Sequence, residues 1–199
     1  YRRQRQMCIR DSLYGLYHCD EGEIWWNGVK QDFQKPLDAI ACGIGMVHQH
    51  FMLVRPMTVL QNIILGMKVE SYPFIKKKDI AKKIKALSQK YGLAVDVDKR
   101  IDELSVGEQQ RVEILKALYR NAKLLVLDEP TAVLTPQETE VLFSVLRSLK
   151  EDGHSIILIS HRLAEIMEIT DKITVLRSGK RIDTLTTAKC TEALLSQLM

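Results

Sequence analysis

The segment KLLVLDEP, residues 123–130, carries the clearest information about the fold of this 199-residue chain. Four consecutive apolar residues before an acidic pair are typical of a strand that is buried on both faces of a parallel sheet. The run SIILIS, residues 155–160, has the same character and predicts a second such strand. Because the carboxyl ends of parallel strands open onto a ligand crevice, Asp128 and Glu129 are expected at a binding site.

The second half of the chain alternates between strand and helix patterns. We expect strands over 123–128 and 154–160, helices over 108–120, 135–153 and 161–169, and a final strand pair over 172–178 and 180–185. This alternation predicts an α/β fold with a mostly parallel sheet flanked by helices.

The first half contains smaller elements. Asn27-Gly28 lies between two extended stretches and predicts a hairpin, that is, a small antiparallel β element. A short strand is expected over 43–50 and helices over 58–66 and 76–92. In the second helix, Ile80, Ile84 and Leu87 form a narrow apolar stripe while the lysines face outward. These helices read as an insert in the α/β fold.

Composition narrows the class of protein. The chain is 46% hydrophobic with a formal net charge of +4, which is mild and concentrated in the N-terminal arginines and residues 76–85. This charge does not argue for nucleic acid as a partner. Its apolar runs are shorter than the roughly 20 residues of a membrane helix. Four scattered cysteines suit reduced thiols, so we expect a cytoplasmic location.

A second motif, LSVGEQQR at residues 104–111, lies about twenty residues before Asp128. Ser105 is placed to cap the following helix, and Gly107 permits close backbone approach, so the first turn offers an anion site. Val112, Leu115 and Tyr119 share one helix face, which is expected to dock on the sheet. At the strand end, an Asp can hold Mg²⁺ and an adjacent Glu can activate water for attack on phosphate.

LSVGEQQR followed by LLVLDEPTA resembles the signature motif and Walker B motif of ATP-binding cassette (ABC) transporter ATPases. The resemblance extends across nearly the whole chain from about residue 13. Within it, GIGMVHQHFMLV resembles the Q-loop region of this family and SIILISHR its switch segment. The resemblance implies a P-loop NTPase-like fold with a helical subdomain over about residues 52–107, and it implies ATP and Mg²⁺ as cofactors.

The same resemblance assigns roles to individual residues. It implies catalytic roles for Glu129, which would polarise water, His161, which would contact the γ-phosphate, and Gln49. Mg²⁺ would be held by Asp128 and Gln49. The ATP of an opposing cassette would contact Ser105, Val106, Gly107 and Glu108. A metal site at His48 and His50 is not favoured, since the sequence shows no third ligand.

The sequences MVHQHFMLV and LSVGEQQRVEILKAL resemble those of the first cassette of nucleoside and simple-sugar importers. This resemblance implies coupling of ATP hydrolysis to solute uptake at the cytoplasmic face of the cell membrane. The implied partners are a second cassette, expected in the same full-length chain, transmembrane permease subunits and, indirectly, an extracytoplasmic solute-binding protein. The transported solute is not specified, because specificity resides mainly in those other subunits.

Two departures accompany the resemblance. No P-loop, G-x-x-x-x-G-K-[ST], occurs in the sequence; the register of LYGLY at residues 13–17 would put its lysine near Gln6 and its hydroxyl near Met7. We interpret residues 1–12, YRRQRQMCIRDS, as an anomalous segment in its place, from a truncated or misassembled reading frame, with 13–199 a partial nucleotide-binding domain. The family's D-loop often ends in Asp, where this chain has Thr135.

Two alternatives remain beside the importer ATPase. One is a non-hydrolysing remnant of such a cassette, which predicts weak ATP–Mg binding by the 199-residue chain. The other is a chromosome- or repair-type ATPase, whose long coiled coil is not matched by the short helical insert here.

Overall fold

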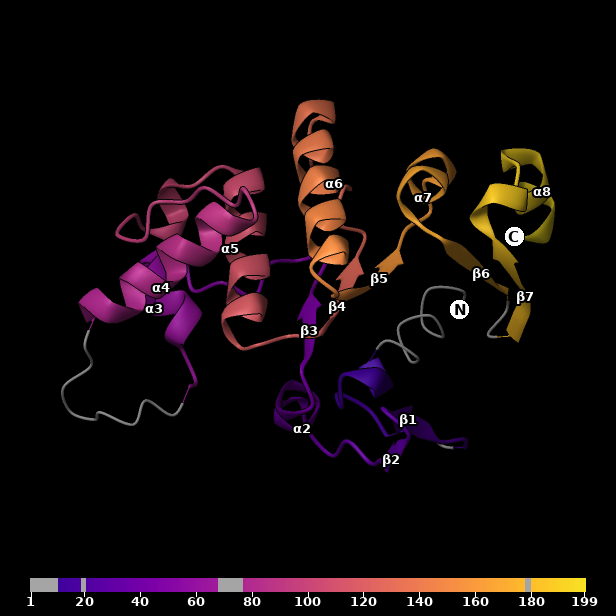
Figure 1. The fold of residues 1–199 in the computed structure, drawn as a ribbon, viewed down its shortest axis with the longest axis horizontal. Coiled ribbons are helices and arrows are strands. Elements are labelled where there is room, and N and C mark those ends of the chain that lie inside the picture. The colour runs from indigo at the N-terminus through magenta and orange to yellow at the C-terminus, as the bar shows by residue number, and fades with distance from the viewer. Residues whose placement is uncertain (1–10, 19–20, 68–76, 178–179) are drawn as a thin grey trace. The chain divides into compact units, whose positions relative to one another are not determined.

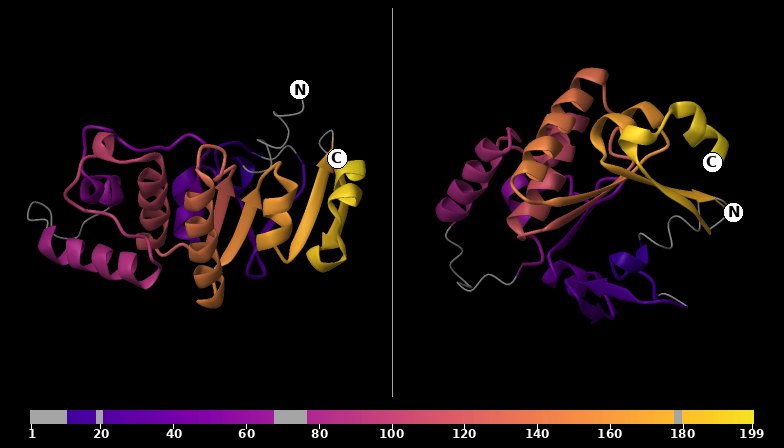
Figure 2. Two further views of the ribbon diagram at one scale, coloured as in Figure 1. Left: turned by 90° about the horizontal axis from the view of Figure 1, so that it is seen from above. Right: turned by 45° about the vertical axis from the view of Figure 1, so that its right-hand side comes forward.

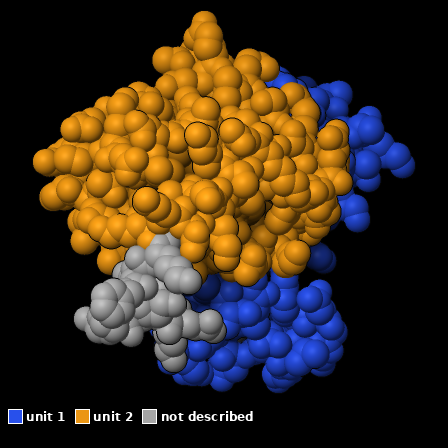
Figure 3. All heavy atoms as spheres, turned by 60° about the vertical axis from the view of Figure 1, so that its left-hand side comes forward, with its two compact units in different colours: residues 1–44, 158–199 blue, residues 45–157 orange. Residues whose placement is uncertain are grey.

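The computed structural model describes residues 11–18, 21–67, 77–177 and 180–199 (Figure 1). The chain divides into two compact units (Figure 3). Unit 1 consists of residues 1–44 and 158–199, and unit 2 of residues 45–157. Residues 1–10, including the expected P-loop positions Gln6 and Met7, lie outside the described residues.

A three-stranded parallel sheet lies almost wholly in unit 2. Its strands are β3 (Ile44–Val47), β4 (Leu124–Asp128) and β5 (Ser155–Ile159), in the order β3-β4-β5. The central strand β4 is buried along its whole length, as its continuous apolar run predicts.

The expectation that β5 is likewise buried on both faces is wrong. Residues of β5 are intermediate or exposed, and the side chain of Ile157 is 41% exposed. Position at the edge does not explain this exposure, because β3 is the other edge strand of the sheet and all four of its residues are buried. Strand β3 is covered by helix α5 (Val106–Tyr119), whose Ala117 lies directly against Gly45. A continuous apolar run therefore identified the strand but not its depth in the sheet.

The described part of unit 2 also contains five helical segments. They are α3 (Val59–Ile64), α4 (Lys77–Lys90), the short 3₁₀ helix η1 (Ile101–Glu103), α5 (Val106–Tyr119) and α6 (Pro136–Glu151). Figure 1 shows α3, α4 and α5 gathered together beside β3, and α5 packs against both of the other two. The helical insert predicted from the sequence is therefore present.

Helix α5 has buried residues on more sides than predicted. Besides Val112 and Leu115, it buries polar side chains such as Gln110 and Glu113. On the sheet side, a Cβ at Gly45 of β3 would come within 2.8 Å of the Ala117 methyl group. Helix α5 thus contacts the sheet as well as α3 and α4, which explains why a single apolar face underestimates its burial. By contrast, α4 follows its predicted stripe, with Ile84 fully buried.

Three helices of unit 2 begin with a capping box. Thr58 of α3, Ser105 of α5 and Thr135 of α6 each accept a hydrogen bond from the backbone N–H three residues on, while a Gln or Glu side chain at that position accepts from the cap's own N–H. Such a cap stabilises a helix by about 1 kcal/mol. The predicted cap at Ser105 is confirmed.

The N-terminal part of unit 1 contains the predicted hairpin. Strands β1 (Ile24–Trp26) and β2 (Val29–Gln31) pair in antiparallel fashion. At the turn, φ is +49° for Asn27 and +78° for Gly28. Positive φ at both central residues is the requirement of the tight hairpin turn that Asn-Gly favours. Helix α2 (Pro36–Ala41) follows.

The C-terminal part of unit 1 confirms the last predicted helix and strand pair. It contains α7 (Leu163–Ile169), β6 (Lys172–Arg177), β7 (Lys180–Thr186), the 3₁₀ helix η2 (Thr187–Lys189) and α8 (Glu192–Leu198). Strands β6 and β7 form an antiparallel pair beside α8 (Figure 2). A small core of Ile173, Val175, Cys190 and Leu195 holds them together. None of the helices in the described ranges has the length and apolar composition that crossing a membrane requires.

Candidate nucleotide site

The predicted catalytic and metal-binding residues of unit 2 follow two neighbouring strands. Gln49 lies two residues after the end of β3, and Asp128 and Glu129 lie at the end of β4. Because β3 and β4 are adjacent and parallel, their carboxyl ends share one edge of the sheet. Asp128 is buried and only 7% exposed, whereas Gln49 is exposed. The fold therefore brings these three residues to a common edge.

The backbone at Glu129 is in a left-handed conformation, with φ of +47°. This is uncommon for a residue with a side chain and is further disfavoured here by the following Pro130. Such conformations cost of order 1–3 kcal/mol and occur where the surrounding structure holds them for function. The strained residue is the one predicted to polarise water.

A hydrogen bond from α5 holds the turn that follows Glu129. The buried side chain of Gln110 donates from Nε2 to the carbonyl oxygen of Pro130 at 2.8 Å. Gln110 is 2% exposed, and Thr131, next in the turn, is also 2% exposed. The helix that starts at the signature motif is thus bonded directly to the acidic turn. Sequence reasoning missed Gln110, because a glutamine in a polar run is indistinguishable from a solvated residue.

The four residues predicted to contact ATP occupy the start of α5. Ser105 Oγ accepts from the Glu108 N–H at 3.2 Å, and Glu108 Oε2 accepts from the Ser105 N–H at 2.8 Å. The Ser105 hydroxyl retains its own proton as a donor. Ser105 and Val106 are exposed, and Gly107 is buried. The N–H groups of Gly107 and Glu108 already bond to the Glu138 carboxylate and to Ser105 Oγ, so the group that this turn can offer to an anion is the Ser105 hydroxyl.

Glu138, at the start of α6, lies against the buried Gly107. A Cβ at Gly107 would come within 2.9 Å of Glu138 Cδ and closer still to one carboxylate oxygen. The Thr135 N–H donates to Glu138 Oε2 at 3.0 Å, and this bond is the main reason why the pKa of Glu138 is lowered. The nearby Arg111 lowers this pKa further. A side chain at residue 107 would therefore displace the carboxylate of Glu138.

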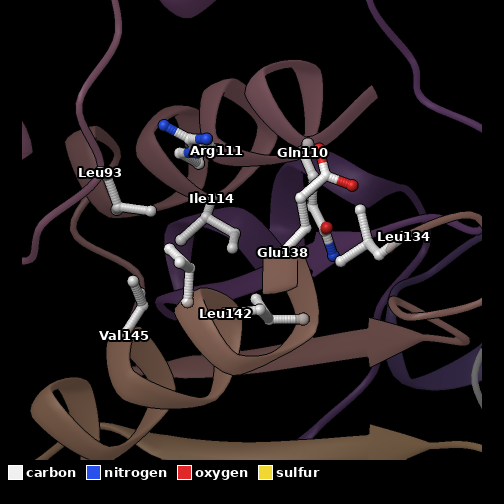
Figure 4. Close-up of a pocket in the computed structure, with 10 residues that line it drawn as sticks. Leu93, Gln110, Arg111, Ile114, Leu134, Glu138, Leu142 and Val145 are labelled. Atoms are coloured by element: carbon white, nitrogen blue, oxygen red, sulfur yellow. The ribbon is translucent and has the colours of Figure 1, made fainter. Parts of the chain in front are cut away.

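The same contact region forms a pocket between α5 and α6 (Figure 4). Its empty space is about 300 Å³, part of it open to solvent. The lining residues are Leu93, Gly107, Gln110, Arg111, Ile114, Leu134, Glu138, Val141, Leu142 and Val145. Most are apolar, and Gly107 is the one predicted ATP-binding residue among them. The pocket thus lies beside the contact between α5 and α6, and Asp128 and Glu129 are not among its lining residues.

Thr135, the departure noted at the family's D-loop, has a clear structural role. Its hydroxyl caps α6 by accepting from the Glu138 N–H at 3.3 Å. Asp and Thr are both favoured at helix N-caps, because each offers a side-chain oxygen to the first turn. The substitution therefore preserves the start of α6.

His161 is exposed in the segment between β5 and α7. It belongs to unit 1, whereas Glu129 belongs to unit 2. Next to it, the Arg162 N–H donates to Ser160 Oγ at 3.1 Å. Its contact with a γ-phosphate stays a prediction.

Comparison with protein families gives a match to the ABC transporter family over residues 9–132, which includes Gln49, the signature motif and the acidic turn. The chain belongs to the ABC transporter family. This cassette also resembles two curated proteins over 96% of its length. It is 50% identical to the nucleoside import ATP-binding protein NupA of Lactococcus lactis subsp. cremoris and 47% identical to the guanosine import ATP-binding protein NupO of Bacillus subtilis.

The cassette spans 38% of the length of each of these two relatives. A ribose import ATP-binding protein, RbsA of Hahella chejuensis, is 44% identical over 85% of the cassette and 34% of its own length. Among solved structures, an ATP-binding cassette of an ABC transporter in its ADP conformation superposes with a TM-score of 0.82. It covers 96% of the present chain and 79% of its own, at 24% sequence identity, which establishes a shared fold.

Proposed function

We propose that this ABC cassette is part of the ATP-binding subunit of an importer, in which ATP hydrolysis is coupled to uptake of a nucleoside or simple sugar. The observation that carries the proposal is the family match over residues 9–132, which includes the signature motif and the acidic turn, together with 47–50% identity to two import ATP-binding proteins. The names of the relatives, nucleoside, guanosine and ribose import proteins, support the solute class.

The proposed roles follow from the chemistry of each group. Glu129 accepts a proton from the attacking water, and Gln49 orients that water from the same sheet edge. His161 supports the γ-phosphate. The start of α5, from Ser105 to Glu108, contacts the phosphates of ATP held by an opposing cassette, with the Ser105 hydroxyl as the donor.

The donor set at the sheet edge fits magnesium. Mg²⁺ is held by oxygen ligands, commonly one or two carboxylates together with substrate phosphates, and Asp128 and Gln49 supply a carboxylate and an amide oxygen. When bound, the ion would neutralise charge that develops on the phosphates. The proposed partners are a second cassette, permease subunits and, through them, a solute-binding protein. The proposed location is peripheral, at the cytoplasmic face of the membrane.

The test uses the importer assembled from the full-length native protein and its permease. We expect Glu129→Gln to abolish ATP hydrolysis and uptake of labelled nucleosides and pentoses, whereas Glu140→Gln, on exposed surface of α6, leaves both unchanged. Continued hydrolysis in Glu129→Gln would contradict the role of Glu129. Uptake of neither solute class by the unsubstituted importer would contradict the assignment of solute.

A further inference from the structure

A buried charged pair on α5 has no part in the mechanism above. The side chains of Glu113 and Lys116 are 4% and 17% exposed, and Lys116 Nζ lies 3.8 Å from Glu113 Oε1. Burial raises the pKa of Glu113 and lowers that of Lys116, since both charges are poorly solvated; the nearby Arg120 opposes the rise at Glu113 and adds to the fall at Lys116. Among the described residues, Glu113 Oε1 has no hydrogen-bond partner. The pair therefore carries a desolvation cost that reduces its contribution to stability.

Both members of the pair contact the backbone of Met52, three residues after Gln49. Lys116 Nζ donates to the Met52 carbonyl oxygen at 3.2 Å. On its other side, the Met52 N–H bonds to the carboxylate of Glu113. The Met52 side chain itself is 64% exposed. The loop is thus held at this point through its peptide groups and not through an apolar anchor.

Helix α3 holds the same loop two residues later. Asn62, fully buried, accepts from the Val54 N–H at 2.7 Å and donates to the Val54 carbonyl oxygen at 3.1 Å. Between β3 and α3, the segment 48–57 has no regular secondary structure of its own. Side chains from α5 and α3 therefore supply the hydrogen bonds that an irregular segment must otherwise take from water.

Stability alone does not account for the pair. Replacing a buried ion pair by apolar residues of similar volume is often neutral or stabilising, because the desolvation cost of two charges offsets their attraction. What an apolar pair cannot do is bind the N–H and C=O of Met52. The specific contribution of Glu113 and Lys116 is consequently to the position of the loop.

We propose that Glu113 and Lys116 are positioning residues that fasten the loop after Gln49 to α5. The part of the loop at Met52 is then fixed to α5, the helix that begins at the signature motif. The first residues of the loop, including Gln49, continue directly from β3. The relevance of this link to catalysis rests on the proposed function, in which Gln49 orients the attacking water.

The test is residue-resolved amide exchange by NMR on the 199-residue chain, which needs no nucleotide and so stays informative if the proposed function fails. In the double variant Glu113→Leu with Lys116→Met, we expect exchange of the Met52 amide to rise at least tenfold. Amides of β4, such as that of Val126, should keep their protection. Lys85→Met, an exposed lysine of α4, is the matched control and should change neither.

Two results would overturn the proposal: an unchanged Met52 amide, or equal increases at Met52 and in β4, which would mean that the pair only stabilises the core. Lys116→Arg keeps a cationic donor and is expected to keep the protection of Met52. If the double variant does not fold, Glu113→Gln has the same shape. It should raise Met52 exchange by about threefold, because a neutral oxygen accepts a weaker hydrogen bond, and no increase would again refute the link.

Discussion

The carboxylate of Glu138 lies against the α-carbon of Gly107, so that the first turn of α6 and the first turn of the signature helix α5 pack without room for a side chain between them. The relationship connects two segments that the sequence separates by the whole of β4. It means that any side chain at residue 107 displaces Glu138, although Gly107 does not have a positive φ.

We predict that Gly107→Ala displaces Glu138 and breaks the capping box with Thr135. The free energy of unfolding should fall by about 1 kcal/mol, the usual contribution of a helix cap. Urea denaturation measures this change. In a Glu138→Ala background the same substitution should cost much less, because the two residues share one contact. Additive effects of the two substitutions would show that the contact does not limit residue 107.

The lowered pKa of Glu138 predicts a pH dependence of stability. The stabilisation is present above the ordinary glutamate pKa of 4.5 and is lost as the pH falls through the lower value of the folded state. The difference in unfolding midpoint between the unsubstituted chain and Glu138→Gln should therefore shrink on acidification below pH 4.5. Glu140→Gln is the charge-matched control on the same helix. A difference that stayed constant at low pH would contradict the prediction.

The left-handed backbone of Glu129 predicts opposite responses to two substitutions. Glu129→Gly relieves the strain, while Glu129→Val places a β-branched residue in a conformation that such residues rarely adopt. We expect Glu129→Val to be less stable than Glu129→Gly by about 1–2 kcal/mol in chemical denaturation. Equal stability of the two variants would mean that residue 129 relaxes to an ordinary conformation.

A polar contact at the far end of α4 predicts a further loss of stability. The Tyr91 hydroxyl donates to Asp152, which also binds Lys90 at 2.7 Å, and Tyr91 is only 6% exposed. Tyr91→Phe removes the hydroxyl and its hydrogen bond but keeps the ring. The free energy of unfolding should therefore fall by about 1 kcal/mol. Tyr17→Phe, at a position that is 65% exposed, is the control and should have no effect. Identical results for the two variants would argue against a contribution from the hydroxyl.

Patterns within a few residues were sufficient for much of the fold. The apolar run before Asp128 predicted the central strand β4, and Asn27-Gly28 predicted the hairpin. Ser105 predicted the cap of α5, whose second bond is the one that the Ser105 N–H donates to the Glu108 carboxylate. Each of these features involves residues no more than about four positions apart, so their spacing already specifies the hydrogen bonds or the buried face.

The site was predicted at the level of motifs rather than contacts. Gln49, Asp128 and Glu129 were expected near one ligand crevice, and the parallel neighbours β3 and β4 bring them to one sheet edge. The strained backbone of Glu129 and the packing of Glu138 on Gly107 were not foreseen. Neither feature can be predicted from residue type alone, since glutamate is common both in acidic turns and in first turns of helices.

Burial and long-range hydrogen bonds were settled only by the packed chain. The apolar run of β5 resembles that of β4, but the residues of β5 are partly exposed whereas those of β4 are all buried. Lys116 reaches the backbone of Met52 across 64 positions of sequence, and Gln110 reaches Pro130 across 20. Local spacing specifies helices, caps and turns, whereas these contacts exist because α5 packs against both the sheet and the helical insert. That arrangement determines which polar side chains are buried and which backbone groups they bind.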